Sequence, residues 1–251
     1  MTRTWLVTLL LAPLGCSGKC ECGPSGTATA QAAPPPAPGA ALAPAPVPAA
    51  GPPAPGGAFF VDPEVGNNTL AAVFEAKLGE RINAVSSSVR CELTYDEKTL
   101  AVAGACSVPL TSLKVDADDT KTEHFQQWAT NKKSEPKDCK LEAKLDGVKL
   151  AQPLAAETAV PFSADLPFSV CGRARADGGR EHVTGAATYL PAGSYGEQAT
   201  IKVRAKIEKW NRDSYHIGPK YTEGWLARVQ SLAKVVAEEG TIELNLFAKA
   251  K

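Results

Sequence analysis

Apolar and polar side chains alternate with a period of two along residues 59–251, which is typical of β-strands with one buried face. Over residues 85–95 the odd positions are mostly apolar, and the even positions are polar or charged. The charged segment 96–98 then turns the chain, and residues 100–110 repeat the alternation on their even positions. We therefore predict an antiparallel hairpin whose two apolar faces lie on the same side.

The same alternation recurs later in the chain, and strands do not alternate regularly with helices. A parallel sheet needs crossover connections, which are usually helices, and this chain lacks such a regular alternation. The pattern therefore favours an all-β fold, a barrel or sandwich of seven or eight antiparallel strands. The further strands are predicted at residues 70–74, 140–145, 166–170, 183–189, 201–207 and 242–248.

Two segments have helical rather than strand periodicity. A capping-box pattern at residues 120–123 predicts a short helix that carries Phe125 and Trp128 on one side. A longer amphipathic helix, with Trp225 on its apolar face, is predicted between Gly224 and Gly240. Its polar face has few basic residues, so packing across the barrel is favoured over insertion into a membrane surface.

The N-terminal region is predicted to be a targeting segment followed by a spacer. Residues 1–15 have a basic start and an apolar run too short to span a bilayer, as in an export signal peptide. The run ends at Cys16 in a pattern similar to a bacterial lipobox, although Pro13 stands where leucine is usual; cleavage without lipidation is the alternative. Residues 16–57 form a proline- and alanine-rich linker, and residues 58–251 form the folded domain.

Charge and cysteine content refine the class of protein. The chain has 27 basic and 27 acidic residues, a balance that argues against nucleic-acid binding. If Cys16 of the seven cysteines carries lipid, an even number is left, which suits disulfides in an oxidising compartment. The hairpin places Cys91 and Cys106 nearly opposite each other, so we predict that they pair and leave Cys139 to pair with Cys171.

Three segments of this chain resemble the YceI-like family. Residues 106–113, with 122–125 after an acidic stretch, resemble the family's strand that leads into a histidine-bearing helix. Residues 207–218 are similar to its isoleucine-asparagine-arginine-aspartate-aromatic-glycine stretch, and residues 61–63 to its opening strand. The chain departs from the family at residues 66–69, where a histidine-serine pair is usual. The resemblance implies an antiparallel, lipocalin-like β-barrel with one or two short helices.

The resemblance also implies a lumen that holds a polyisoprenoid or another amphiphilic lipid. Barrel geometry allows this, since a barrel of about eight strands either holds one small ligand or fills its interior with side chains. We thus expect a non-enzymatic envelope protein, in the periplasm or at the outer membrane, that sequesters or carries such a lipid. Its partners are the apolar ligand and the membrane, with a homodimer left open and no cofactor or metal. The alternative is a stalk-displayed interaction domain with a filled barrel. The residues expected to contact lipid are Phe74, Val102, Leu110, Phe125, Trp128, Val203, Ile207, Arg212 and Trp225.

A hydrolase is the third hypothesis, and the sequence offers little for it. Neither a zinc-protease histidine pair nor a nucleophile-elbow serine motif occurs. Ser214 and His216 are two residues apart on what we predict to be a strand end, so they point the same way while Asp213 points away. We interpret them as surface residues. Arg212 is expected either to pair with Asp213 at the barrel mouth or to meet an anionic head group.

Overall fold

The alternating segments form strands of one antiparallel sheet in the computed structural model, which describes residues 51–64, 67–76, 79–131, 134–222 and 236–251. The strands are β1 Gly57–Val61, β2 Thr69–Ala76, β3 Arg81–Ser86, β4 Arg90–Asp96, β5 Ala101–Pro109, β6 Lys114–Val115, β7 Lys140–Lys149, β8 Ala159–Leu166, β9 Phe168–Val170, β10 Arg173–Ala174, β11 Glu181–Leu190, β12 Thr200–Asn211 and β13 Val236–Ala250. The helix α1 covers Asp119–Thr130, and the 3-10 turns are η1 Leu110–Ser112, η2 Pro136–Asp138, η3 Arg212–Tyr215 and η4 Pro219–Tyr221.

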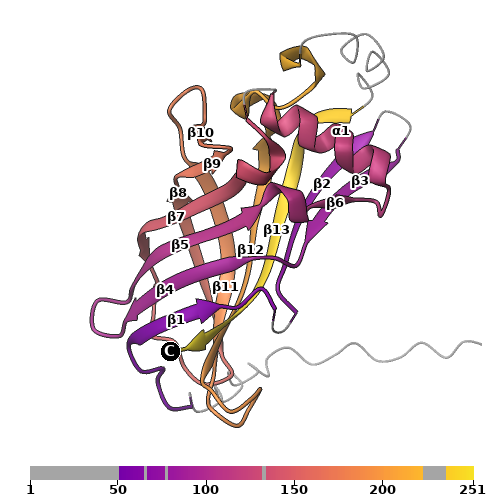
Figure 1. The fold of residues 1–251 in the computed structure, drawn as a ribbon. Helices are drawn as coiled ribbons and strands as arrows, with labels where there is room; N and C mark the ends of the chain where they lie inside the picture. The colour runs from indigo at the N-terminus through magenta and orange to yellow at the C-terminus, as the bar shows by residue number, and fades with distance from the viewer. Residues whose placement is uncertain (1–50, 65–66, 77–78, 132–133, 223–235) are drawn as a thin grey trace, which may run out of the picture. The chain divides into compact units, whose positions relative to one another are not determined.

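The long strand β13 organises the sheet. It pairs with β12 along one edge; along the other edge it pairs with β2 between Val236 and Asn245 and with β1 at its last residues. The main path of the sheet runs β10, β9, β7, β5, β4, β1, β13, β12, β11, β8, while β2, β3 and β6 branch from β13 (Figure 1). The predicted all-β antiparallel class is therefore confirmed. The described residues contain more strands than the expected eight because several strands are short or interrupted.

Pro167 connects β8, the last strand of this path, to β9, the second strand of the path. Strand β8 pairs with β11, and the chain then passes through Pro167 into β9, which pairs with β7. The amide of Lys144 in β7 donates a hydrogen bond of 3.1 Å to the carbonyl of Pro167. Beyond that bond, the described residues of β7 and β8 form no ladder with each other. The sheet thus curls into a barrel-like fold whose seam lies between β7 and β8.

The hairpin predicted at residues 85–110 is present, but its first strand is shorter than expected. Strands β4 and β5 pair with Cys91 directly opposite Cys106, and these two cysteines form a disulfide. Cys139 and Cys171 form the second disulfide, which joins the start of β7 to the turn after β9. Residues 87–89 interrupt the predicted strand and separate β3 from β4, so Val85 lies on β3 and is exposed rather than buried.

Two expectations about helices need correction. The helix α1 starts at Asp119, and its cap is Asp118, which accepts a hydrogen bond from the Lys121 amide; the expected capping box begins two residues later. The last part of the segment predicted as an amphipathic helix is strand, because β13 begins at Val236 and continues through Gly240. The rest of that segment, Trp225 included, lies outside the described residues.

The end of the proline-rich linker belongs to the fold. Ala54 is buried, and its amide donates a hydrogen bond of 2.8 Å to the carbonyl of Leu154. The amide of Ala156 donates to the carbonyl of Pro52, and Pro53 forms a β-bridge with Ala155. The folded part therefore starts before the boundary expected at residue 58. The predicted signal peptide (residues 1–15), Cys16 and residues 17–50 lie outside the described residues. Within the described residues, no helix is both long and apolar enough to cross a membrane.

Candidate functional site

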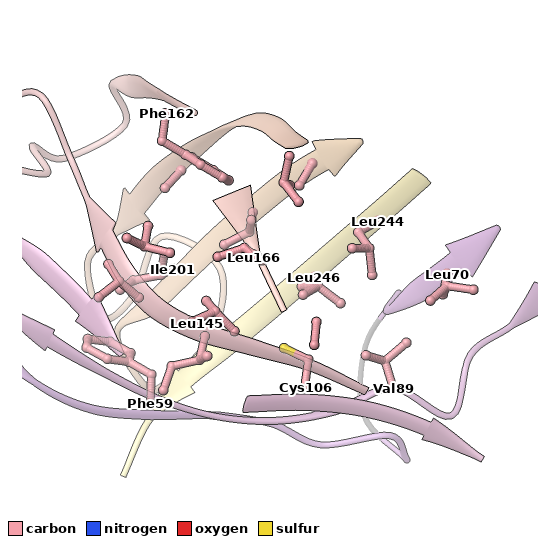
Figure 2. A pocket seen from close by; sticks show the side chains of 18 of the residues that line it. Phe59, Leu70, Val89, Cys106, Leu145, Phe162, Leu166, Ile201, Leu244 and Leu246 are labelled. Carbon is pink, nitrogen blue, oxygen red and sulfur yellow. The ribbon is translucent and has the colours of Figure 1, made fainter. Parts of the chain in front are cut away.

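The concave face of the sheet encloses a cavity of about 120 Å³. Inward-facing side chains from β1, β4, β5 and β7 line one side, and side chains from β8, β11, β12 and β13 line the other. Figure 2 shows these two sets facing each other, with Phe59 and Leu145 on one wall and Ile201 and Leu246 on the other. The apolar lining arises from the period-two alternation of each strand, which directs every second side chain inward.

The middle of the barrel is apolar without being fully packed. Val102, Leu145, Val203, Ala205 and Leu244 line the cavity and are apolar, yet each is only partly buried. Apolar side chains that face the interior of a close-packed protein are normally buried, because packing density there matches that of organic crystals. Their remaining exposure indicates free volume inside the barrel, which an apolar ligand could occupy.

Aromatic side chains close one end of the cavity. We call Phe74, Phe168, Trp210 and Tyr215 the aromatic cluster: Trp210 stacks on Tyr215 at a centroid distance of 5.5 Å, and Phe168 meets both rings edge-on. All four are buried, and Phe168 also lines the cavity. Such edge-to-face and stacked pairs contribute about 0.5–1.5 kcal/mol each beyond area burial. These ring contacts therefore stabilise the fold at the end of the cavity that Phe168 borders.

Phe59, Tyr95 and Leu154 line the cavity at the end away from the aromatic cluster. The hydroxyl of Tyr95 accepts a hydrogen bond of 3.3 Å from the Leu154 amide, while Ala54 binds the Leu154 carbonyl. The end of the linker thus holds Leu154 in place over the lumen.

One charged side chain stands in this apolar lining. Among the described residues that line the cavity, Glu181 alone is charged, and it is 3% exposed. Its Oε1 accepts a hydrogen bond of 2.6 Å from the Tyr215 hydroxyl and one of 3.3 Å from Arg175 Nη1. Burial, together with this bond to Glu181, raises the pKa of Tyr215, so the phenol remains a neutral donor. The sequence pattern places Glu181 at the start of an alternating strand, where it looks like a surface residue.

Only some of the predicted lipid contacts line the cavity. Val102, Val203 and Ile207 line the cavity. Phe74 belongs to the aromatic cluster, and Leu110 is buried in η1; neither is among the lining residues. Phe125 and Trp128 lie on α1 and are partly buried against the core outside the cavity, and Trp225 lies outside the described residues.

Arg212 has a different environment from the one expected. Its guanidinium is buried and donates three hydrogen bonds to backbone carbonyls, to Ile217 at 2.8 Å, Ala237 at 3.1 Å and Val236 at 3.2 Å. The expected pair with Asp213 is not the arrangement found, because Asp213 binds Lys220 and the Tyr221 hydroxyl instead. Arg212 therefore joins the segment after β12 to the start of β13.

A serine, a histidine and an aspartate do come together, but not those considered from the sequence. On the outer face of β8 and β11, His182 Nδ1 lies 2.8 Å from Asp165 Oδ1, and His182 Nε2 lies 3.2 Å from Ser163 Oγ. All three side chains are exposed and none lines the cavity. Ser214 lies within η3 and His216 is its left-handed cap, not a strand end as predicted. The order of hydrogen bonds resembles a catalytic triad, although nothing beside it forms a described substrate pocket.

Comparison with known proteins gives a structural similarity only. No family model matches the chain, and no curated protein matches it. Ten chains of solved structures match. One is a polyisoprenoid binding domain from Saccharophagus degradans implicated in plant cell wall breakdown, with a TM-score of 0.49 and 12% sequence identity, over 77% of this chain and 98% of that chain.

Proposed function

We propose that this protein binds one apolar chain in the lumen of its barrel. The observation that carries the proposal is the set of partly buried, inward-facing apolar side chains around a cavity of about 120 Å³. Burying a ligand there is favourable by roughly 25 cal/mol per Å² of apolar surface removed from water. Affinity that comes from burying apolar surface needs few polar contacts, which is consistent with the scarcity of polar binding motifs in the sequence.

The size of the cavity limits what the closed barrel holds. An apolar cavity of about 150 Å³ takes up one benzene molecule, and the cavity here is slightly smaller at about 120 Å³. The barrel as it stands accommodates a short prenyl or acyl segment. A full polyisoprenoid requires the lining to repack or the seam between β7 and β8 to widen. We assign the ligand to the prenyl and acyl lipids, with a polyisoprenoid as the specific candidate.

The proposed setting is the cell envelope, with the domain held at a membrane by lipid on Cys16 and separated from it by the proline-rich linker. This part of the proposal is supported by the residue pattern of the N-terminal region and by the two disulfides of the fold. Sequestration or transport of the lipid is the role we propose, because the cavity supports binding and neither role requires a catalytic group in it.

The test is native mass spectrometry of the full chain carrying Cys16→Ser, purified from an oxidising compartment, with extraction of any bound lipid. Replacing Cys16 removes the anchor lipid from the extract. We expect a stoichiometric prenyl or acyl adduct. Ala205→Phe places a ring inside the cavity and should abolish the adduct, whereas Ala103→Phe, on the exposed outer face of β5, should leave it unchanged.

The second candidate function is an interaction domain that carries no ligand. A bare protein mass, unchanged after incubation with prenyl and acyl lipids, would support it and overturn lipid binding. Loss of the adduct in Ala103→Phe as well as in Ala205→Phe would also count against a site in the lumen.

A further inference from the structure

We propose that the seam between β7 and β8 is a lateral entrance through which an apolar chain reaches the cavity. This inference rests on the proposed function and adds the route by which the ligand enters. It also gives the part of a long chain that exceeds the cavity a place to lie, between the two strands.

One end of the seam is held closed. Residues 141–143 of β7 pair with β9, and the disulfide between Cys139 and Cys171 joins the start of β7 to the turn after β9. The hydrogen bond from the Lys144 amide to the Pro167 carbonyl follows directly after this pairing. This end is therefore a fixed point from which the rest of the seam can part.

The rest of the seam carries no ladder. Residues 145–149 of β7 and 159–166 of β8, all of them described, do not pair with each other. On its other side β8 pairs with β11 along its whole length, and β7 pairs with β5. Parting any of those strands would break a row of backbone hydrogen bonds, each of which stabilises the fold. The barrel therefore widens at the lowest free-energy cost along the seam.

The two edges are also poorly suited to pair with each other. Successive residues of a strand direct their backbone groups to opposite edges, so Pro161 presents its backbone to the same edge as Pro167, which faces β7. Pro161 has no amide hydrogen to donate there. On the other edge β7 contains a bulge, because its register with β5 shifts between Leu145 and Val148 and Gly147 has a φ of 82°. Bulges disrupt pairing locally, so both edges are built to stay unpaired.

Apolar side chains border the seam on the inside. Leu145 on β7 and Phe162 and Ala164 on β8 line the cavity, and all three are only partly buried. Figure 2 shows Leu145 and Phe162 among the lining side chains. An apolar chain that passes between the two strands therefore exchanges water for apolar side chains as it enters, which is favourable. The entrance has the same chemistry as the cavity behind it.

A covalent bridge across the seam tests this route. The full chain carrying Cys16→Ser, Cys20→Ser and Cys22→Ser retains only the cysteines of the two disulfides. Asp146→Cys on β7 and Asp165→Cys on β8, both at exposed positions, are then joined with a flexible bismaleimide. Stopped-flow fluorescence measures how fast the neutral fluorophore N-phenylnaphthylamine enters, with displacement by geraniol as the check that it occupies the lumen. We expect the bridge to slow association at least about tenfold, since binding that needs a conformational change is slow when that change is hindered.

The matched control bridges two strands that already form a ladder. Thr184 on β11 and Lys206 on β12 are register partners. Thr184→Cys and Lys206→Cys, joined by the same reagent, should leave the association rate within about twofold of the unbridged form. The unbridged form of each double variant is its own reference, which removes any effect of the substitutions themselves.

A second pair of variants needs no bridge. Phe162→Leu removes ring atoms beside the seam, and Phe59→Leu removes the same atoms from β1, which borders neither edge of the seam. We expect Phe162→Leu to speed uptake at least about threefold and Phe59→Leu to leave the rate nearly unchanged.

Equal uptake rates with and without the seam bridge would overturn the lateral entrance and leave lipid binding intact. If the bridge does not form, equal rates in Phe162→Leu and Phe59→Leu would overturn it in the same way. No geraniol-displaceable probe signal in the full chain without these bridges would count against the proposed function itself.

Discussion

Replacing Arg212 distinguishes a structural role from a ligand-binding role. The buried guanidinium donates three hydrogen bonds to the carbonyls of Ile217, Val236 and Ala237, and it lies 5.8 Å from the centroid of the Trp128 ring. A hydrogen bond to a charged group contributes about 1.5–3 kcal/mol. Removing the side chain also recovers its desolvation cost, so the net effect is smaller than three such bonds. We expect Arg212→Ala to lower the free energy of unfolding by about 3–5 kcal/mol.

Urea denaturation followed by circular dichroism measures this change, and the slope of the transition checks that unfolding stays two-state. Arg204→Ala, an exposed position on β12, is the control and should change stability by less than about 0.5 kcal/mol. Arg212→Lys should be intermediate, because an ammonium cannot reproduce the planar fork of three donors. A stability loss below about 1 kcal/mol in Arg212→Ala, together with lost lipid binding, would refute the structural role and restore the head-group hypothesis.

Three further outcomes are expected. Gly185→Ala should lower the melting temperature measured by differential scanning calorimetry by several degrees, since a Cβ there would lie 2.3 Å from the Arg204 carbonyl oxygen, whereas Gly196→Ala, with nothing within 4 Å, should be nearly neutral. Partial burial acts to raise the pKa of Asp116, but hydrogen bonds from the Asn83 amide and Lys121 outweigh it and hold that pKa below its ordinary value. Asp116 therefore stabilises the fold above about pH 4 and ceases to do so as the pH falls below that, and Asp116→Asn should flatten this acid-side loss in pH-dependent urea titrations. Replacing Cys139 and Cys171 with serine should cost about 3–4 kcal/mol in the same assay; a loss under about 1 kcal/mol would show that the bridge contributes little.

The parts of the fold predicted from the sequence are those set by local alternation. The β4–β5 hairpin is an example, because its register follows from apolar positions on both sides of a short charged turn, and the same register places Cys91 opposite Cys106. Residues 87–89 show the limit of this reasoning, since the alternation continues through them while the chain passes from one pairing partner to another. Only the partners in the folded sheet decide where such a strand breaks.

The cavity could be predicted only in part. Alternation identifies inward-facing positions such as Val102 and Val203, but it does not state how much volume remains between the walls of the barrel. Glu181 follows a charged loop and looks like a solvated strand end, yet closure of the sheet carries it against Tyr215. Arg212 is the reverse case, because a cation that the sequence suggests as a ligand contact has a structural role instead. Its guanidinium donates to the backbone carbonyls of Ile217, five residues away, and Ala237, twenty-five residues away.

The position of β13 in the sheet has a consequence for how the chain folds. This strand pairs with β1 and β2 from the N-terminal side of the domain and with β12 from the C-terminal side. Pairings so distant in sequence have a high loop-closure cost, and folding dominated by them is slow. A nascent chain cannot close the barrel until β13 is available, so its apolar strands stay exposed to chaperones, proteases and one another until that strand has been made. Disulfide formation in the early β4–β5 hairpin needs no such wait, which makes that hairpin the natural first unit of the folding pathway.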